Sequence, residues 1–364
     1  MRAALLTREN SPLELVDDIE VSGPAAGQVL VNVAHCGICH SDLTIIETGL
    51  GPHPVVLGHE AAGVVEAVGP GVSALAPGDH VVLVAIAPCG RCYWCVRGKT
   101  TVCEKAMTFM TGTLPDGSTA LSRGGRPVYR GLGVGGFAQQ VLTTESGAVR
   151  IDPDLPLDLA SVIGCAIQTG VGAVLNTARV EEGATVLVMG LGGVGMAVVQ
   201  GARIAGASRI IASDPLPERR QAARSFGATD LVDPAHEDVV EVCRELTGVG
   251  VDYAFDAAGS ARLLEAGVAA SCNGGTTVSV GAPDAAETLD QLSPVLFAIT
   301  EKRLVGCLYG GGNPHWQRPR LVSLWRRGLL DLEGMITARR PLDEINGGFD
   351  ELRAGRGLRT VLSV

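Results

Sequence analysis

Four cysteines lie close together in the stretch CGRCYWCVRGKTTVC, at Cys89, Cys92, Cys95 and Cys103. Four thiolates at this spacing on a short loop suit a tetrahedral Zn²⁺ site with no open position, which would be a structural site. An iron–sulfur cluster is a weaker alternative, because its last cysteine usually lies closer and precedes a proline, whereas Glu104 follows Cys103. Disulfides are a second alternative, which three-residue spacings make awkward.

A second motif, GLGGVG, places Gly190, Gly192 and Gly195 in the pattern G-x-G-x-x-G. The apolar run 185–189 before it predicts a buried strand, and the segment 194–205 after it predicts a helix. In a dinucleotide site the three glycines allow a tight turn, backbone approach to a pyrophosphate and close packing of helix on strand. The chain contains 49 glycines, so a turn without a ligand is the alternative. The flanking strand and helix favour cofactor binding.

Asp214 lies 19 residues after the last glycine of this motif, at the end of the next apolar run. A carboxylate there accepts hydrogen bonds from the adenosine ribose and repels a 2′-phosphate, which favours NAD over NADP. Arg219 and Arg220 follow closely, so NADP use is the alternative. The predicted phosphate loop, at the start of the helix, also includes the backbone of Gly193 and Val194.

The composition is that of an ordinary globular enzyme. A chain of 364 residues suggests about two domains, and 46% of the residues are hydrophobic and 19% charged. A net charge of −10 argues against nucleic acid or anionic membranes as partners. We expect no uncharged apolar run of about 18 residues, hence no spanning helix, and no signal peptide in MRAALLTREN. Ten cysteines without such a signal predict a reducing cytoplasm.

The elements that would position these motifs are of two kinds. After residue 185, strands alternate with helices, which predicts a doubly wound parallel sheet covered on both faces. We expect its strands at 185–189, 209–213, 230–232, 251–256, 276–280 and 302–306, and its helices at 193–206, 216–226, 237–247 and 260–271. The first part of the chain is instead β-rich, with short strands at 3–7, 13–16, 28–34, 61–68 and 80–85.

Residues 107–135 are rich in glycine and aperiodic, which predicts a long surface loop. The remaining elements are expected as strands at 137–143 and 358–364 and helices at 155–161, 168–178, 319–328 and 341–354. The elements after residue 312 would return to the first domain.

Taken together, six motifs carry a resemblance that covers essentially the whole chain: CGICHSD (36–42), GHE (58–60), the four-cysteine loop, GCAIQTG (164–170), GLGGVG and LRTVL (358–362). In this order they resemble the zinc-dependent medium-chain alcohol dehydrogenases, and most closely the branch of the liver-type and glutathione-dependent formaldehyde dehydrogenases. The resemblance implies a GroES-like β-rich catalytic domain, residues 1–167 and 309–364, and a Rossmann NAD-binding domain, residues 168–308. The long loop is similar to that of dimeric members, so it implies a homodimer.

By this resemblance, Cys39, His59 and Cys165 hold a catalytic Zn²⁺ and leave a fourth position open, the set for which the family is known. Two thiolates offset the charge of the metal, which still lowers the pKa of a bound hydroxyl. Taken singly, each side chain could instead have a structural role. His59 could be a hydrogen-bonded histidine of the core, and Cys165 could be a buried free thiol. Glu60 is expected either as a spare acid near the metal or as a buried charge paired with an arginine. Asp42 resembles the acid that orients the histidine ligand, with a helix N-cap as the alternative.

Further roles are implied in the same way. Ser41 resembles the hydroxyl that takes the substrate proton, but the histidine that continues the liver-type relay is replaced by Thr44. His40 and Arg359 occupy positions that contact the pyrophosphate. The nicotinamide half of the cofactor would meet Thr169, Val280 and Tyr309.

The substrate is implied by two departures from the family pattern. Ala85 stands where the liver-type branch carries a bulky aromatic residue, so the pocket would admit bulky or aromatic primary alcohols. Met107 replaces the arginine with which the glutathione-dependent branch binds its adduct, which argues against S-hydroxymethylglutathione. The alternatives are a reductase of a conjugated double bond or carbonyl and, from another class, a non-catalytic cofactor-binding protein.

Overall fold

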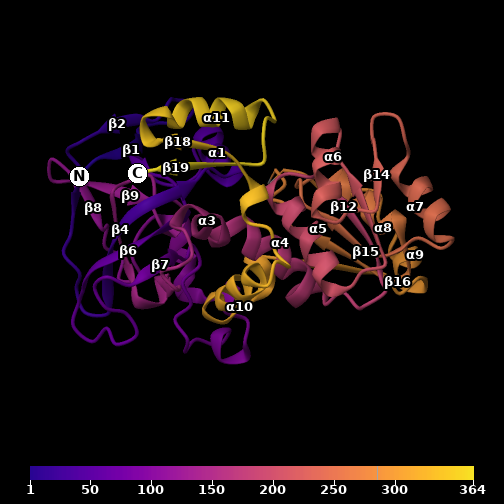
Figure 1. The fold of residues 1–364 in the computed structure, drawn as a ribbon, viewed down its shortest axis with the longest axis horizontal. Helices are drawn as coiled ribbons and strands as arrows, with labels where there is room; N and C mark the ends of the chain where they lie inside the picture. Colours follow the sequence, from indigo (N-terminus) through magenta and orange to yellow (C-terminus); the bar gives the residue numbers. More distant parts are fainter. Residues whose placement is uncertain (285) are drawn as a thin grey trace. The chain divides into compact units, whose positions relative to one another are not determined.

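The computed structural model describes residues 1–284 and 286–364. The chain forms two compact units (Figure 1). Unit 1 consists of Met1–Cys165, Asn313–Trp325 and Leu332–Val364, and unit 2 consists of Ala166–Gly312 and Arg326–Asp331. The sequence predicted divisions at 167/168 and 308/309 and did not predict the short return at 326–331.

Unit 1 contains a mainly antiparallel seven-stranded sheet that brings the two ends of the chain together. Its order is β11 (Ala148–Arg150), β7 (His80–Leu83), β6 (Glu60–Val68), β4 (Gln28–Gly37), β19 (Arg359–Ser363) and β18 (Ile336–Pro341), and β10 (Gln140–Thr144) also pairs with β4. Strand β4 is antiparallel to both β6 and β19, and Val361 pairs with Gly37. The last strand of the chain therefore lies beside the residues that precede Cys39.

A second sheet of unit 1 corrects the predicted loop over 107–135. Its order is β2 (Glu14–Val16), β1 (Ala3–Leu6), β5 (Val55–Val56), β9 (Arg126–Arg130), β8 (Leu121–Arg123) and β3 (Glu20–Val21). Strands β8 and β9 and the short helix α2 (Thr108–Thr111) all come from the segment predicted as loop, and Leu114, Leu121 and Val128 are buried. The prediction was wrong because these strands are short and, apart from pairing with each other, gain their partners β3 and β5 from distant parts of the chain.

Besides the short helix α2, unit 1 contains further α-helices. They are α1 (His40–Thr48), α3 (Leu157–Val162), α10 (Pro314–Arg326) and α11 (Ile345–Arg353). Helix α1 was not predicted, nor was strand β18. Helix α10 begins at Pro314 rather than Pro319, so the proline predicted to open the helix lies inside it.

One long helical run corrects the expectation that no stretch could span a membrane. The helical run Leu157–Ala178 is long and apolar enough by length and composition, but 83% of its apolar stretch is buried inside the protein. That degree of burial is typical of a core helix. The run is also irregular, because π-helical stretches occupy Ile163–Ile167 and Ala173–Ala178.

Unit 2 is the predicted doubly wound α/β fold, which confirms the fold class. Its parallel sheet has the order β14 (Asp230–Val232), β13 (Arg209–Ser213), β12 (Thr185–Met189), β15 (Val251–Asp256), β16 (Ser271–Ser279) and β17 (Arg303–Gly306). Its helices are α4 (Gln168–Gly172), α5 (Gly193–Ala205), α6 (Pro217–Phe226), α7 (Val239–Thr247), α8 (Ala261–Ala270) and α9 (Pro294–Ile299). Successive strands are placed on one side of β12 up to β14 and on its other side from β15 onward, and ligands of such folds bind where this order switches, beyond the carboxyl ends of the strands.

Candidate metal centres and dinucleotide site

Unit 1 gathers four potential ligands at one point. The ligand atoms of Cys39, His59, Glu60 and Cys165 all lie within 4.8 Å of one another. Cys39 precedes α1, His59 and Glu60 stand where β6 begins, and Cys165 lies in the π-helical stretch. Three segments that are distant in sequence thus converge, as the resemblance implied.

A buried carboxylate orients the histidine. His59 Nδ1 lies 3.2 Å from Asp42 Oδ1, which also accepts the Gly58 N–H at 2.9 Å. Burial alone would lower the pKa of His59, but the Asp42 carboxylate and the two cysteines outweigh it and hold that pKa well above its usual value. Since Nδ1 faces Asp42, Nε2 remains for a metal.

A hydrogen bond joins the two sulfurs, with the Cys165 thiol as the donor of the proton. A hydrogen bond from Cys165 lowers the pKa of Cys39, and the same bond raises the pKa of Cys165. A divalent cation would take the place of that proton, because metal binding requires both thiolates. Two thiolates and one neutral imidazole are a donor set that fits Zn²⁺ with a further position left open.

Glu60 is paired with an arginine, as one of its two predicted alternatives required. Arg359 Nη2 lies 3.1 Å from Glu60 Oε1, and both side chains are buried. The same guanidinium donates to the Ile38 carbonyl at 3.2 Å and lies 3.9 Å from Cys39 Sγ. Burial raises the pKa of Glu60 to about 8, against the opposing effect of Arg359. The carboxylate nevertheless lies among the ligand atoms, so the other alternative also stays open.

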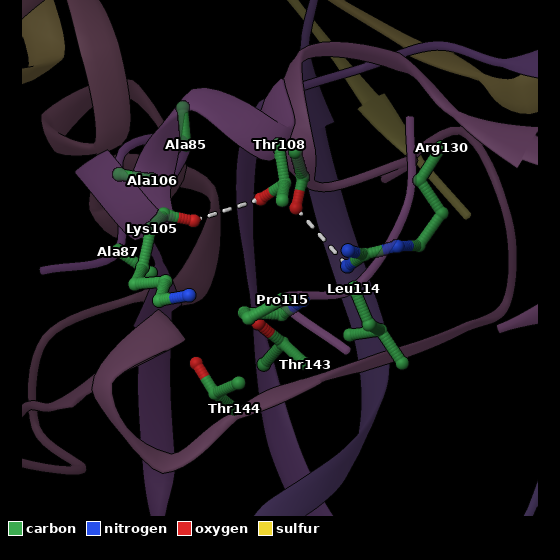
Figure 2. Close-up of a pocket in the computed structure, with 11 residues that line it drawn as sticks. Ala85, Ala87, Lys105, Ala106, Thr108, Leu114, Pro115, Arg130, Thr143 and Thr144 are labelled. Carbon is green, nitrogen blue, oxygen red and sulfur yellow. Dashed lines mark hydrogen bonds between the residues drawn. The ribbon is translucent and has the colours of Figure 1, made fainter. Parts of the chain in front are cut away.

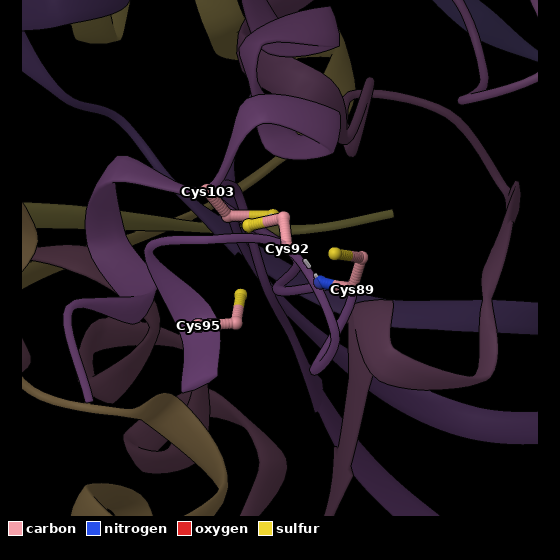
Figure 3. Close-up of side chains that lie close together, drawn as sticks. All are labelled: Cys89, Cys92, Cys95 and Cys103. Atoms are coloured by element: carbon pink, nitrogen blue, oxygen red, sulfur yellow. Dashed lines mark hydrogen bonds between the residues drawn. The ribbon is translucent and has the colours of Figure 1, made fainter. Parts of the chain in front are cut away.

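The four-cysteine loop forms a second cluster in unit 1. The sulfurs of Cys89, Cys92, Cys95 and Cys103 lie within 4.8 Å of one another and point toward a common centre (Figure 3). Backbone N–H groups, that of Cys95 above all, lower the pKa of Cys92 to about 6, which favours the thiolate. Four sulfurs in this arrangement fit a closed tetrahedral Zn²⁺ site.

In unit 2 the three glycines of the G-x-G-x-x-G pattern, Gly190, Gly192 and Gly195, differ in the space around them. Gly190 has φ +86°, and a Cβ there would lie 2.7 Å from that of Ala258. A Cβ on Gly195 would overlap the Gly190 carbonyl oxygen, whereas Gly192 faces open space at the start of α5. These are the tight turn, the close packing and the open approach that a pyrophosphate site requires.

Asp214 is buried at the end of β13, next to this loop. Its Oδ2 accepts the Leu191 N–H at 2.7 Å and its Oδ1 accepts the Leu216 N–H at 2.9 Å. Each carboxylate oxygen can accept a second hydrogen bond, so the ribose hydroxyls still have acceptors. Arg219 Nη1 lies 3.9 Å from Asp214 Oδ2, and Arg220 is held by Asp233 at 2.8 Å.

The other predicted residues divide between the two units. In unit 1, Ser41 Oγ lies 3.9 Å from Cys39 Sγ, His40 is exposed, and the Thr44 hydroxyl donates to the His40 carbonyl at 3.1 Å. In unit 2, buried Thr169 and Tyr309 lie on packed segments, because Gln168 Nε2 donates to the Tyr309 carbonyl at 3.3 Å. Val280 is half-buried after β16. Their contacts with a cofactor stay predictions.

Two buried arginines of unit 1 were missed by the sequence reasoning. Arg318, on α10, donates to the backbone carbonyls of Val82 and Gly164, and Arg130, on β9, donates to carbonyls of the 107–142 region. No motif marks either one. Arg130 also borders a pocket (Figure 2), together with Ala85, Ala87, Lys105, Ala106, Thr108, Leu114, Pro115, Gly133, Thr143 and Thr144.

Comparison with known proteins agrees with this geometry. Residues 25–153 match the alcohol dehydrogenase GroES-like domain, and residues 193–324 match the zinc-binding dehydrogenase family. The chain is 38% identical to an S-(hydroxymethyl)glutathione dehydrogenase of Escherichia coli O1:K1 / APEC over 368 residues, which is 99% of each protein. The chain belongs to the zinc-dependent medium-chain alcohol dehydrogenase family.

Solved structures of similar proteins support the same assignment. An alcohol dehydrogenase zinc-binding domain protein from Burkholderia ambifaria has a TM-score of 0.95 and 36% identity, covering 100% of this chain and 98% of that one. Benzyl alcohol dehydrogenase from Acinetobacter calcoaceticus has a TM-score of 0.94 and 32% identity, covering 100% and 99%. As a member of this alcohol dehydrogenase family, the chain is a zinc-dependent oxidoreductase, with a catalytic and a structural metal site and NAD as its cofactor.

Proposed function

We propose that this dehydrogenase transfers hydride between NAD(H) and a primary, bulky or aromatic, alcohol/aldehyde pair. The observation that carries the proposal is the convergence of Cys39, His59 and Cys165 on one point in a buried site. When bound there, Zn²⁺ supplies a Lewis acid that polarises the substrate oxygen. The presence of a complete set of ligands for the catalytic metal also argues against the two alternatives, a conjugated-bond reductase and a non-catalytic cofactor-binding protein.

The chain's own residues would prepare this step. Asp42 holds the ring of His59 through Nδ1. Ser41, close to Cys39, would accept the proton of the alcohol hydroxyl. The Thr44 hydroxyl already donates to the His40 carbonyl, so it is a poor substitute for a histidine that both accepts and releases a proton. Arg359 keeps Glu60 paired inside the site.

The preference for NAD over NADP would come from Asp214. Its carboxylate faces the glycine loop through the Leu191 N–H and would repel a 2′-phosphate. Arg220 is engaged by Asp233 and by the Asp214 carbonyl, which leaves it poorly placed to attract that phosphate. His40, Thr169, Val280, Tyr309 and Arg359 are proposed as further cofactor-binding residues.

The bulk of the substrate is inferred from Ala85. This half-buried methyl group borders the small pocket of Figure 2, where Ala87, Ala106 and Leu114 are further small or apolar neighbours. A larger side chain at position 85 would fill that space. The similarity to a benzyl alcohol dehydrogenase supports an aromatic substrate.

A second candidate substrate is a glutathione adduct, because relatives at 38% identity are named S-(hydroxymethyl)glutathione dehydrogenases. Lys105 and Arg130 bring positive charge to the pocket beside Ala85, and a glutathione carboxylate needs such charge. Against it, Met107 is exposed where the arginine of that branch would stand. Benzyl-type alcohols therefore remain the first candidate.

A substrate panel tests the proposal. Benzyl alcohol, cinnamyl alcohol, ethanol and formaldehyde with glutathione are each assayed by NADH absorbance, with NAD and with NADP. We expect the highest kcat/KM with an aromatic alcohol and NAD, and loss of activity in Cys165→Ser. Undetectable turnover across alcohols and aldehydes, despite bound zinc and NAD, would revive the non-catalytic alternative.

We further propose a cytoplasmic homodimer. The ten cysteines, all within the described residues, form no disulfides with one another, as is usual in a reducing compartment. Unit 2 exposes Val295, Leu296 and Ile299 on α9, near the edge strand β17, and unpaired strand edges with apolar neighbours are typical of subunit interfaces. Sedimentation at the mass of a tetramer or a monomer would refute the dimer.

A further inference from the structure

We propose that Arg318 is a positioning residue for the catalytic metal site, and that it acts by fixing the backbone that carries Cys165. The proposal rests on the proposed function only in taking Cys165 as a metal ligand. Arg318 would act on the backbone of the chain rather than on the reacting atoms. Its effect would reach the metal through one residue, the glycine that precedes the ligand.

The Arg318 side chain is completely buried, with 0% of its surface exposed. Its Nη1 donates to the Val82 carbonyl at 2.8 Å and its Nη2 donates to the Gly164 carbonyl at 3.1 Å. Burying a guanidinium costs free energy unless its hydrogen bonds are made, and charged donors form the stronger bonds to carbonyls. One cation on α10 therefore joins two backbone segments that are remote from it in sequence.

The segment that contains Gly164 has an irregular backbone. Cys165 lies in the π-helical stretch Ile163–Ile167, where the ordinary hydrogen bonds of an α-helix are interrupted. A carbonyl in such a stretch can accept a hydrogen bond from outside the helix. The Gly164 carbonyl accepts one from the Arg318 guanidinium. This bond restrains the backbone directly before the ligand.

The segment that contains Val82 is connected to another ligand, His59. Val82, on β7, pairs with Ala62 on β6, and β6 begins at Glu60, next to His59. Gly164 also packs closely here, since a Cβ on it would lie 3.4 Å from the Cα of Glu60. By joining Val82 to Gly164, Arg318 fixes the backbone of Cys165 relative to the strand pair that presents His59.

The test compares Arg318→Met and Arg318→Lys with a matched control, Arg130→Met. Arg130 is also a buried arginine of unit 1, 3% exposed, and it donates to the carbonyls of Thr113, Gly133 and Leu142. The readouts are the affinity of the catalytic site for Zn²⁺, by chelator competition, and the absorption spectrum of the Co²⁺-substituted site. Zinc retained by the four-cysteine loop is the internal standard in every variant.

We expect Arg318→Met to bind catalytic Zn²⁺ about 10- to 100-fold more weakly and to change the cobalt spectrum, since partners that orient ligands have effects of this size. Arg318→Lys keeps the charge but has one nitrogen in place of the two that donate here, so its affinity is expected to lie between those of Arg318→Met and wild type. Arg130→Met is expected to melt at a lower temperature with its metal affinity and cobalt spectrum unchanged.

Wild-type affinity and spectrum in Arg318→Met would overturn the proposal, as would an equal loss of affinity in Arg130→Met. If Arg318→Met does not fold, Arg318→Lys and Arg318→Gln decide by the same criterion, and wild-type values in both count against the proposal. A failure of the proposed function would give a different result. If Cys165 is not a metal ligand, the Cys165→Ser variant, with Arg318 intact, would take up as much metal as wild type.

Discussion

His59 and Asp42 are joined through a buried contact of 3.2 Å between Nδ1 and Oδ1, and the same carboxylate oxygen accepts the Gly58 N–H at 2.9 Å. Asp42 thus fixes both the ring and the backbone next to it. Neither His59 nor Asp42 is exposed, so water does not compete for the contact. The basicity of the ligand nitrogen depends on the charge of this carboxylate.

Replacing Asp42 with Asn is therefore expected to weaken catalytic-metal binding and to lower kcat/KM, each by about 10- to 100-fold. Steady-state kinetics and chelator competition measure the two effects. Asp256→Asn is the control, because Asp256 is a buried carboxylate of unit 2 that accepts the Ala258 and Gly259 N–H groups. Equal losses of metal affinity in both variants would contradict the role given to Asp42.

The charge of the Asp214 carboxylate is expected to determine the choice between NAD and NADP. Asp214→Asn and Asp214→Gly both remove the charge that repels a 2′-phosphate, and the asparagine variant keeps an acceptor for the loop. We expect the ratio of kcat/KM for NADP to that for NAD to rise roughly tenfold or more, because placing like charges together costs several kcal/mol. Asp233→Asn, which removes the carboxylate partner of Arg220, is the comparison. An unchanged ratio in the Asp214 variants would contradict the assignment.

Features encoded within short stretches were predictable from the sequence. The four sulfurs of 89–103 lie within fifteen residues, and the glycine loop directly joins the strand and helix that it serves. The chemistry of such sites depends on local spacing and backbone freedom, which a sequence displays. For the same reason, the parallel sheet of unit 2 followed from its regular alternation of strands and helices.

Features that depend on distant pairing were not predictable from spacing. Arg359 and Glu60 meet because β19 pairs with β4, which lies beside β6. Without the resemblance, nothing in the sequence shows that a strand at the end of the chain lies beside residues near its beginning. Arg318 gives still less signal, since a charged residue before a proline is expected on a surface. The strands in 107–135 were hidden by glycine and by their shortness.

A substitution in the four-cysteine loop is expected to change the stability of the protein rather than its catalytic chemistry. Cys92→Ser removes one sulfur from a site with no position for substrate, so we expect bound zinc to fall from two ions to one per chain. The melting temperature is expected to drop, by about 2–4 °C for each kcal/mol lost. The pH–rate profile of the folded fraction is expected to match wild type, and a shifted profile would argue for a catalytic role.

The proposed substrate pocket is tested by filling it. Ala85→Phe would place a ring where Figure 2 shows a methyl group, in the pocket that Ala106 and Leu114 also line. We expect kcat/KM for benzyl alcohol to fall by about 10- to 100-fold and that for ethanol to change much less, because a hydrophobic pocket discriminates by volume. Ala85→Val is the graded variant and is expected to give a smaller change in the same direction. If benzyl alcohol and ethanol lose kcat/KM equally, position 85 supports the fold rather than selecting the substrate.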